Sequence, residues 1–422
     1  MFYIERHGLF FGSIAFGILL WVMSYFLLPF HVSEPFHVET SVFIVSCYLM
    51  LVLGFILVKP CSHVSEKNDQ QIYSILNILV AIIIISYLLR WSDLFIIRDL
   101  SFTNEPKINR VLNRENSENS NLIFILASIL KSLYFFPYVV SVKLKYKRNK
   151  PLKLLCLVCL FLPVLEAILK GTRKPLFEIF LIIILCTLVY NQKKITKIKI
   201  TVTALVLTLL LTASMWIVFQ RENLSENMDT EFYEKILKSR YNEILKPKPV
   251  VNSFFADDDV SLPVKFYAMA AMQMGQYVSH GVFEFNHIIR NQNLPISKGS
   301  YTFSTVPRFL NKLGIINNFE ADNPSPREFV YLSAFGAMYI DFRWFSLLFM
   351  FILGMAQKYV FSKSISCFIY TPVVIYFSII NVFLPILNYI RGSGFYPLIC
   401  TLMLIFFIFL YRKIFNEKSL NS

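Results

Sequence analysis

The chain alternates long apolar blocks with short charged segments. Each block holds about 20 residues, the length that an α-helix needs to cross the hydrocarbon core of a bilayer. Apolar residues are continuous within a block, so they mark neither one face of a helix nor an alternating strand. We expect an all-α, polytopic integral membrane protein. The pattern predicts about ten transmembrane helices, at residues 9–30, 41–58, 72–89, 122–142, 152–169, 175–190, 199–219, 344–361, 366–387 and 393–411.

Lysine and arginine in the short connecting segments indicate which end of each helix lies in the cytoplasm, because positive residues resist translocation. The segments "KLKYKRNKPLK" at 143–153 and "KKITKIK" at 193–199 are the most basic. Placing both inside predicts that both termini are cytoplasmic. It also places residues 31–40, which hold two Glu and no Lys or Arg, outside.

One short turn breaks this charge rule. The segment "LKGTRKPL" at 169–176 carries Lys170, Arg173 and Lys174, yet the order of the helices places it on the external side. We expect Gly171 to end one helix and Pro175 to begin the next. Arg173 then lies near a helix N-terminus, where backbone amides favour an anion. Two interpretations stay open: cations that bind a phosphate, and cations at a helix end that extend to the membrane interface.

Composition favours a membrane protein over a nucleic-acid-binding one. Of 422 residues, 56% are hydrophobic and 42 are Phe. The formal net charge of +14 gathers in short segments between apolar blocks, where cations meet anionic headgroups. The seven cysteines resemble no disulfide framework. We therefore expect a lipid bilayer and no nucleic acid as partner.

The apolar blocks stop between residues 220 and 343, which divides the chain into three parts. Residues 1–219 hold seven predicted transmembrane helices, and residues 344–422 hold three more and a cytoplasmic tail. Between them, residues 220–343 form one large periplasmic loop. Its acidic and basic residues nearly balance, and it keeps apolar stretches that need burial. We expect this loop to fold on top of the bundle and to carry the functional site.

An amphipathic helix is predicted near residues 264–291, in "AMQMGQYVSHGVFEFNHIIRNQN". At 100° per residue, its polar side chains project into one narrow stripe. An alternative stays open, in which this helix lies across the membrane face with an ordinary solvated polar side. The stripe contains Gln273, Tyr277, His280, Glu284, His287 and Asn291.

Two members of the stripe are candidate general bases. His280 is the first candidate and Glu284, one turn away, is the second, because either side chain can accept a proton from a substrate hydroxyl. Together with His287 they could also hold Zn²⁺, but no HExxH motif is present. We therefore expect neither a metal nor a cofactor.

Further cations are predicted on the external side. Arg308 and Arg327 lie near prolines in the late part of the loop, and Arg391 precedes two glycines in "NYIRGSGFYP". Glycines at that turn let a phosphate approach the backbone, although a plain turn between helices fits equally well. Asp341 and Arg343 are expected to pair near the membrane interface.

Three motifs carry a family resemblance: "GTRK" at the start of a helix, "YVSHG" in the loop, and "EFVYLSAFGAMYIDFRWFSLLFMFILGM". With the topology, they resemble the bacterial oligosaccharide repeat-unit polymerases, the O-antigen polymerases of the Wzy type. In many relatives a Gly follows the Asp-Phe of the third motif, where this chain has Arg343.

The resemblance implies a GT-C-like glycosyltransferase of the bacterial inner membrane, with its active site facing the periplasm. Such an enzyme transfers the growing glycan from undecaprenyl pyrophosphate to the non-reducing end of an incoming lipid-linked repeat unit, without nucleotide sugar. Its partners are the undecaprenyl-pyrophosphate-linked oligosaccharide, a chain-length regulator and a flippase.

The residues suit this chemistry, because guanidinium groups stabilise a leaving diphosphate through charge-assisted contacts. We expect His280, with Glu284 as second candidate, to act as catalytic base. The expected pyrophosphate- and glycan-binding residues are Arg173, Lys174, Arg308, Arg327, Arg391, Tyr277 and His287. Two other functions stay open: an O-antigen ligase of the same general build, and a lipid-linked oligosaccharide flippase or other transporter.

Overall fold

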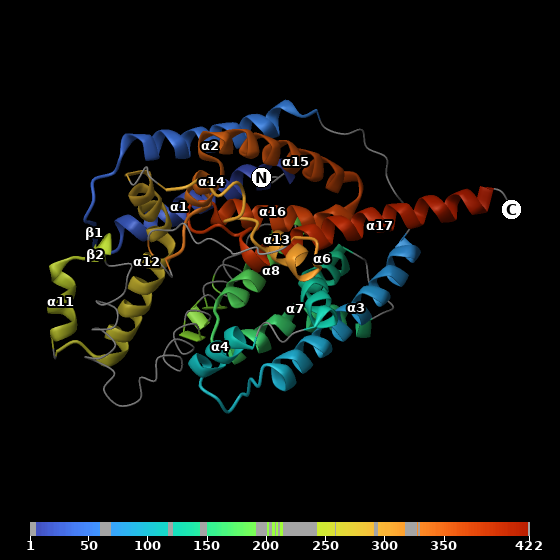
Figure 1. Ribbon diagram of the computed structural model, residues 1–422, viewed down its shortest axis with the longest axis horizontal. Helices are drawn as coiled ribbons and strands as arrows, with labels where there is room; N and C mark the ends of the chain where they lie inside the picture. Colours follow the sequence, from blue (N-terminus) through green and yellow to red (C-terminus); the bar gives the residue numbers. More distant parts are fainter. Residues whose placement is uncertain are drawn as a thin grey trace.

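The computed structural model is mainly helical, with one small sheet (Figure 1). It describes residues 6–59, 69–116, 121–143, 150–190, 243–257, 259–290, 294–316, 327 and 330–420, with short stretches between 201 and 213. Within these residues, six helical runs are long and apolar enough to cross a membrane, and residues 368–383 and 395–410 form shorter apolar helices. This supports a membrane protein, whereas the described residues do not confirm the predicted count of ten.

Helices occupy the first six predicted blocks. Most of the seventh block, 199–219, lies outside the described residues. The bounds are α1 (Arg6–Phe26), α2 (Val38–Leu57), α3 (Asp69–Ser92), α5 (Leu122–Leu130), η2 (Lys131–Phe135), α6 (Phe136–Lys143), α7 (Lys150–Leu169) and α8 (Lys174–Tyr190).

The last three blocks differ from the prediction at their ends. The helical run predicted to begin at 344 begins ten residues earlier, and it bends at Arg343, whose φ is 51°. The next helix ends at Phe383, two residues before Pro385, which has no backbone N–H to continue the helical hydrogen bonds. The elements are α14 (Ala334–Phe342), η4 (Arg343–Phe345), α15 (Ser346–Ser366), η5 (Phe368–Tyr370), α16 (Thr371–Phe383), η6 (Gly392–Gly394) and α17 (Phe395–Leu420).

Helix α16 forms the centre of the bundle. Every residue from 371 to 382 is buried, and α16 contacts α1, α6, α8, α15 and α17. Helices α2 and α15 lie side by side along one edge of the molecule, and α3 and α7 lie on the opposite side (Figure 1). A cluster of buried apolar side chains from these helices forms the core.

Glycines allow α2 and α15 to approach closely. A Cβ atom added to Gly54 would lie 2.1 Å from the Phe351 carbonyl oxygen, and one added to Gly354 would lie 2.1 Å from the Leu51 carbonyl oxygen. Small residues serve this purpose in membranes, where van der Waals packing drives helix association.

A buried polar triad joins three helices inside the bundle. The side-chain amides of Gln357 and Asn381 exchange two hydrogen bonds, of 3.0 and 2.9 Å, between α15 and α16. Asn381 also donates to the hydroxyl of Ser13 in α1, at 3.3 Å. These hydrogen bonds pair polar atoms whose burial without a partner would cost free energy in an apolar surrounding.

The segments outside the bundle include the predicted loop helix. It is α12 (Leu262–Arg290), preceded by α11 (Pro249–Ala256) and followed by α13 (Thr305–Lys312), and α4 (Pro106–Glu115) follows the π-helix η1 (Asp93–Ile97) earlier in the chain. Strands β1 (Phe30–Val32) and β2 (Leu245–Pro247) pair antiparallel, with Phe30 opposite Pro247 and Val32 opposite Leu245. The sequence did not predict this sheet, which ties the end of α1 to the loop.

Candidate functional site

The turn between α7 and α8 has the predicted form. Gly171 adopts a left-handed conformation with φ 58°, and the Thr172 amide donates to the Ala167 carbonyl at 2.8 Å, which closes the end of α7. Helix α8 then begins at Lys174, with Pro175 as its second residue. The three cations of this turn, however, contact three different groups.

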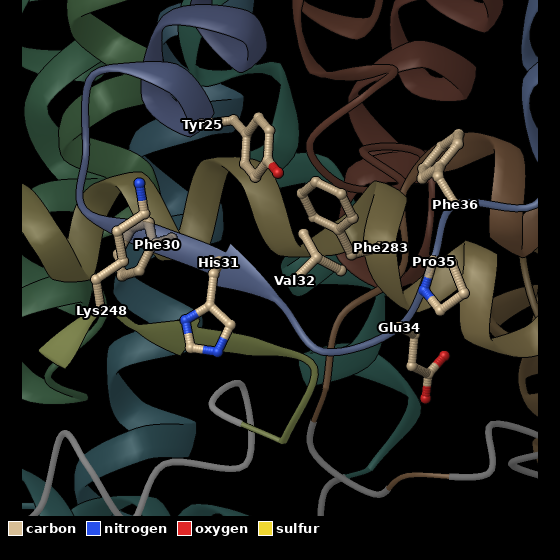
Figure 2. Close-up of a pocket in the computed structure, with 9 residues that line it drawn as sticks. All are labelled: Tyr25, Phe30, His31, Val32, Glu34, Pro35, Phe36, Lys248 and Phe283. Atoms are coloured by element: carbon tan, nitrogen blue, oxygen red, sulfur yellow. The ribbon is translucent and has the colours of Figure 1, made fainter.

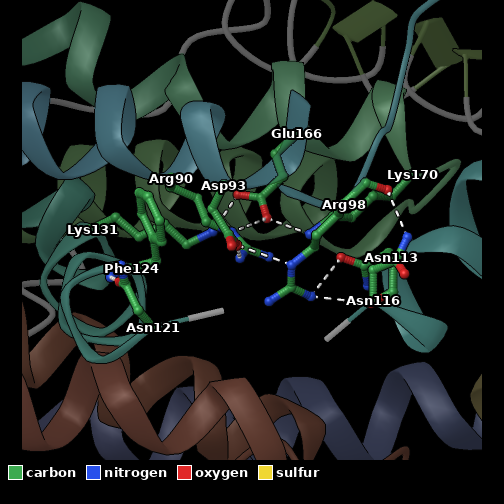
Figure 3. Close-up of polar contacts among 10 residues, drawn as sticks. All are labelled: Arg90, Asp93, Arg98, Asn113, Asn116, Asn121, Phe124, Lys131, Glu166 and Lys170. Carbon is green, nitrogen blue, oxygen red and sulfur yellow. Dashed lines mark hydrogen bonds and ion pairs between the residues drawn. The ribbon is translucent and has the colours of Figure 1, made fainter. Parts of the chain in front are cut away.

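Lys170 belongs to an ion cluster of four cations and two carboxylates (Figure 3). The Glu166 carboxylate pairs with Lys170 at 2.6 Å and with Lys131, and the Asp93 carboxylate pairs with Arg98 at 2.9 Å and with Arg90. Burial lowers the pKa of Lys170 to about 8, although Glu166 opposes this shift. Lys170 is therefore a structural ion-pair partner in this structure.

Helix α4 covers the end of α7. Arg110 donates from Nε to the Lys170 carbonyl at 2.8 Å and from Nη2 to the Gly171 carbonyl at 2.9 Å. The Asn109 amide donates to the Leu169 carbonyl at 2.9 Å. These contacts satisfy carbonyl groups that have no partner within a helix. They hold the turn that carries Arg173 and Lys174.

Helix α12 presents His280 and Glu284 inside the protein rather than to solvent. His280 is 3% exposed and Glu284 is 1% exposed. Val278, Val282 and Ile289, which lie outside the polar stripe, are buried as well. The C-terminal half of α12 is therefore packed on both sides, and the alternative of a solvated polar face does not describe it.

Gly281 explains how α12 packs so tightly. A Cβ atom at this position would lie 2.3 Å from the Ile386 carbonyl oxygen and 2.9 Å from the Ser333 amide nitrogen. The helix therefore crosses directly over the start of α14 and the segment after α16. Because His280 precedes this glycine, its imidazole is fixed against the same segments.

The His280 ring is neutral near pH 7. Its Nδ1 lies 3.0 Å from the Gln276 carbonyl oxygen, and because a carbonyl only accepts, Nδ1 carries the proton. Burial lowers the pKa of His280 to about 4, and the charge of Arg327 acts in the same direction. Nε2 thus carries the lone pair of the neutral imidazole.

Glu284 pairs with Arg327 through both carboxylate oxygens. Arg327 Nε donates to Oε1 at 3.1 Å and Nη2 donates to Oε2, while Nη1 donates to Glu243 at 3.0 Å. Burial alone would lower the pKa of Arg327, but the hydrogen bonds and charges of Glu284 and Glu243 together outweigh it, so the pKa is raised. The pair locks Arg327 in its charged form beside α12.

Arg391 lies against Tyr301, a residue that sequence reasoning did not single out. The guanidinium carbon is 3.8 Å from the centre of the Tyr301 ring, and Nη1 donates to the phenol oxygen at 2.9 Å. Burial raises the pKa of Tyr301 to about 12, opposed by the charge of Arg391 and assisted by that of Glu284. The charges of Arg391 and Glu284 therefore act on the same tyrosine in opposite directions.

Asp341 positions Tyr301, and its expected ion pair with Arg343 is wrong. The carboxylate instead accepts the backbone amides of Tyr301 at 3.0 Å and Thr302 at 2.9 Å. Arg343 donates to the Leu294 carbonyl and stacks on Tyr339, 4.7 Å from its ring centre. The chain bends at Arg343, whose φ is 51°, and its guanidinium binds these groups instead of Asp341.

The other cations of the basic turn reach the same region. Lys174 Nζ lies 4.1 Å from the centre of the Tyr389 ring, next to the glycine turn that follows Arg391. Burial raises the pKa of Tyr277 to about 12, and the nearby charge of Arg173 opposes this rise. Tyr277 in turn lies 5.9 Å from the His280 ring. Arg173 of the turn is therefore near α12, and Lys174 is near the segment that contains Arg391.

Two predicted residues lie further out. Arg308 is exposed on α13, close enough to Tyr396 at the start of α17 for an electrostatic interaction between the two side chains. His287 lies two turns further along α12 than His280, and its Nδ1 lies 2.8 Å from Glu34, a residue that also pairs with Arg290. His287 is therefore not part of the group around Tyr301 and His280.

We call the group of Arg173, Lys174, Tyr277, His280, Glu284, Tyr301, Arg327 and Arg391 the α12 site. Sequence reasoning missed Tyr301 and Glu243, which have no motif around them. Among the residues that the structure describes, no three His, Cys, Asp or Glu side chains are grouped as a metal site requires. Neither a protein-family model, nor a curated protein, nor a solved structure matches this chain.

Proposed function

We propose that the chain is an O-antigen-type repeat-unit polymerase, a membrane glycosyltransferase that uses a polyprenyl-pyrophosphate-linked oligosaccharide as donor. In this proposal the chain has about ten transmembrane helices in a GT-C-like arrangement in the bacterial inner membrane. Both termini are cytoplasmic, and the α12 site faces the periplasm. The support comes from the geometry of the α12 site together with the motif resemblance.

One observation carries the proposal: cations from two segments far apart in sequence lie against aromatic residues around α12. Lys174 lies over Tyr389 and Arg391 over Tyr301. The charge of Arg173 acts on Tyr277, whose ring is 5.9 Å from that of His280. The Arg391 guanidinium hydrogen-bonds to the Tyr301 hydroxyl and stacks on its ring, and it forms no ion pair with a carboxylate of the described part of the chain. A guanidinium without an acidic partner can bind a ligand phosphate through two parallel hydrogen bonds. The group therefore suits a diphosphate.

The reaction proceeds by displacement at a sugar carbon. An acceptor hydroxyl oxygen bonds to the anomeric carbon of the donor glycan, and the bond from that carbon to the pyrophosphate oxygen breaks. Undecaprenyl pyrophosphate leaves with the bonding electron pair. Arg391, Arg173 and Lys174 stabilise the charge that develops on this leaving group. The hydroxyl proton must leave as the new bond forms.

His280 is the base that this geometry favours. Glu284 has both oxygens bound by Arg327, so it acts as a positioning residue for that guanidinium. His280 carries its lone pair on Nε2, although a pKa of about 4 makes it a weak base in this structure. A bound diphosphate would raise this pKa, because a nearby anion favours the protonated imidazole. Substrate binding thus prepares the base that the transfer requires.

The test is turnover by the purified protein. A defined lipid-linked repeat unit is added to the full chain in detergent micelles, and multimers are sought by mass spectrometry. We expect multimers with the wild-type chain and a loss of about a hundredfold in Arg391→Met. The matched control is Arg114→Met, because Arg114 is an exposed cation on α4.

Other outcomes overturn the proposal. Glycan transfer only after lipid A core is added would make the chain an O-antigen ligase. Movement of the lipid-linked unit across vesicles without a new glycosidic bond would make it a flippase. Equal multimer formation in Arg391→Met and Arg114→Met would remove the diphosphate role from Arg391.

A further inference from the structure

A cavity of about 410 Å³ lies between the end of α1, strand β1 and α12 (Figure 2). Its wall includes Tyr25 from the end of α1, Phe36 from the segment before α2, and Phe283 from α12. Tyr25 and Phe36 lie 4.9 and 6.0 Å from Phe283 between ring centres. Three aromatic rings from separate elements therefore surround one space.

The rim of this cavity is polar and ionisable. His31 and Lys248 are exposed on it, from β1 and the start of α11, and Glu34 closes one end. The Glu34 Oε1 atom is bound by His287 at 2.8 Å. Its Oε2 is buried, and no described residue donates a hydrogen bond to it, since Arg290 is 3.7 Å away. The Glu34 side chain is 24% exposed, so its carboxylate can accept a hydrogen bond from a ligand hydroxyl at this end of the cavity.

We propose that this cavity binds a sugar ring of the repeat-unit glycan. The apolar face of a pyranose packs against aromatic rings such as Tyr25, Phe36 and Phe283, while its hydroxyls donate to Glu34. The identity of this glycan, though not the chemistry of the cavity, rests on the proposed function. A volume near the lower end of the range for ligand pockets suits part of an oligosaccharide.

The occupant is a sugar and not a polyprenyl chain. The cavity lies past the C-terminal end of α1, where the chain has left the apolar helix and formed β1. An alkyl chain offers no partner to Glu34, His31 or Lys248, and burying it against them would leave their polar groups unsatisfied. A polyhydroxylated ring meets both the aromatic wall and the polar rim.

The cavity is joined to the α12 site through two short connections. Phe283 on the cavity wall and Glu284 in the α12 site are consecutive residues of one helix. Beside β1, the Ser33 hydroxyl donates to the Glu243 carbonyl at 2.8 Å, and the Glu243 side chain binds Arg327 at 3.0 Å. A glycan in the cavity thus contacts the elements that hold Arg327. We assign the cavity to the acceptor glycan for this reason.

Trp21 provides a reporter for the test, because its ring lies 5.7 Å from Phe283 and 6.0 Å from Tyr25. The probe is the free oligosaccharide released by mild acid from lipid-linked repeat units of the producing organism. It carries neither pyrophosphate nor lipid. Titrated into the full chain in detergent, it should change tryptophan fluorescence saturably, and Trp21→Phe should remove this change while Trp344→Phe keeps it.

Variants at exposed positions identify the site without disturbing the fold. Phe36 is 42% exposed, and Phe36→Ala should weaken binding of the free oligosaccharide about tenfold. Phe102, exposed on a different external segment, supplies the control Phe102→Ala, which should bind as the wild type does. Farnesyl phosphate should leave Trp21 fluorescence unchanged.

Three results would overturn this assignment. The first is the absence of a saturable change in tryptophan fluorescence with the free oligosaccharide. The second is equal affinity of Phe36→Ala and Phe102→Ala for that oligosaccharide, and the third is a change in Trp21 fluorescence with farnesyl phosphate alone. The two proposals fail separately. Oligosaccharide binding without multimer formation would remove the polymerase function and keep the sugar site. Multimer formation without a Trp21 response would remove the sugar site and keep the polymerase function.

Discussion

The guanidinium of Arg327 binds both oxygens of the Glu284 carboxylate, one helical turn along α12 from the buried imidazole of His280. The side chain of Glu284 is 1% exposed and that of Arg327 is 11% exposed. Two opposite charges removed from water depend on each other, because removal of one leaves the other without compensation. This dependence gives the first prediction.

Glu284→Gln should lower the free energy of unfolding by about 3 kcal/mol, because the guanidinium of Arg327 loses its buried carboxylate. The measurement is unfolding of the purified chain in mixed micelles, followed by tryptophan fluorescence. Glu243→Gln is the matched control, since Glu243 binds the same guanidinium but is 59% exposed, and it should cost less than about 1 kcal/mol. Equal effects of the two variants would mean that the Glu284 pair is not buried.

This pair also shows how far the sequence could predict the site. Helical periodicity placed His280 and Glu284 on one stripe, because side chains three and four residues apart share a face. It could not show that Arg327, 43 residues away, occupies both oxygens of Glu284. Periodicity gives the face of a helix, whereas the partner on that face depends on packing between distant segments. The prediction for His287 failed for the same reason, because two turns along the stripe its side chain pairs with Glu34 instead of joining His280.

The transmembrane blocks were more predictable than the site. A continuous apolar run of about 20 residues leaves few alternatives to a helix, so α1, α2 and α7 formed where the pattern placed them. The basic turn also formed as expected, because Gly171 and Pro175 specify its backbone locally. The β1–β2 pairing was missed because it joins three-residue strands more than 200 residues apart, and neither strand has a pattern of its own.

A second prediction concerns acid stability. The pKa of His280 is about 4 in the folded protein, below the ordinary value of 6.5, because the ring is buried. Between pH 6.5 and pH 4 the unfolded chain therefore binds a proton that the folded protein does not. The free energy of unfolding should fall by about 3 kcal/mol as pH decreases through this window, and should not change from this cause above pH 6.5.

His280→Gln should remove this part of the pH dependence, as measured by unfolding midpoints in mixed micelles from pH 4 to pH 8. His31→Gln is the control, because His31 is exposed on β1 and its replacement should leave the profile as in the wild type. A His280→Gln profile with the same slope as the wild type would show that another group causes the acid sensitivity.

A third prediction tests the side assignment. A reporter enzyme that is active only in the periplasm is fused after residue 147 or after Asp257, which follows α11. Because the basic segment at 143–153 resists translocation, the first fusion should be inactive and the second active. An active fusion after residue 147 would invert the bundle and would place the α12 site in the cytoplasm, where the proposed donor is not polymerised.

The final prediction concerns the contact between α2 and α15. A Cβ atom at Gly354 would lie 2.1 Å from the Leu51 carbonyl oxygen, and backbone cannot yield as a flexible side chain can. Gly354→Ala should therefore force the two helices apart and lower the free energy of unfolding by about 2 kcal/mol. Gly12→Ala in α1 is the control, because nothing lies within 4 Å of the added Cβ and alanine favours helix. Gly12→Ala should be neutral or slightly stabilising in the same unfolding assay. If Gly354→Ala were as stable as Gly12→Ala, then α2 and α15 would pack less closely than the 2.1 Å approach at Gly354 requires.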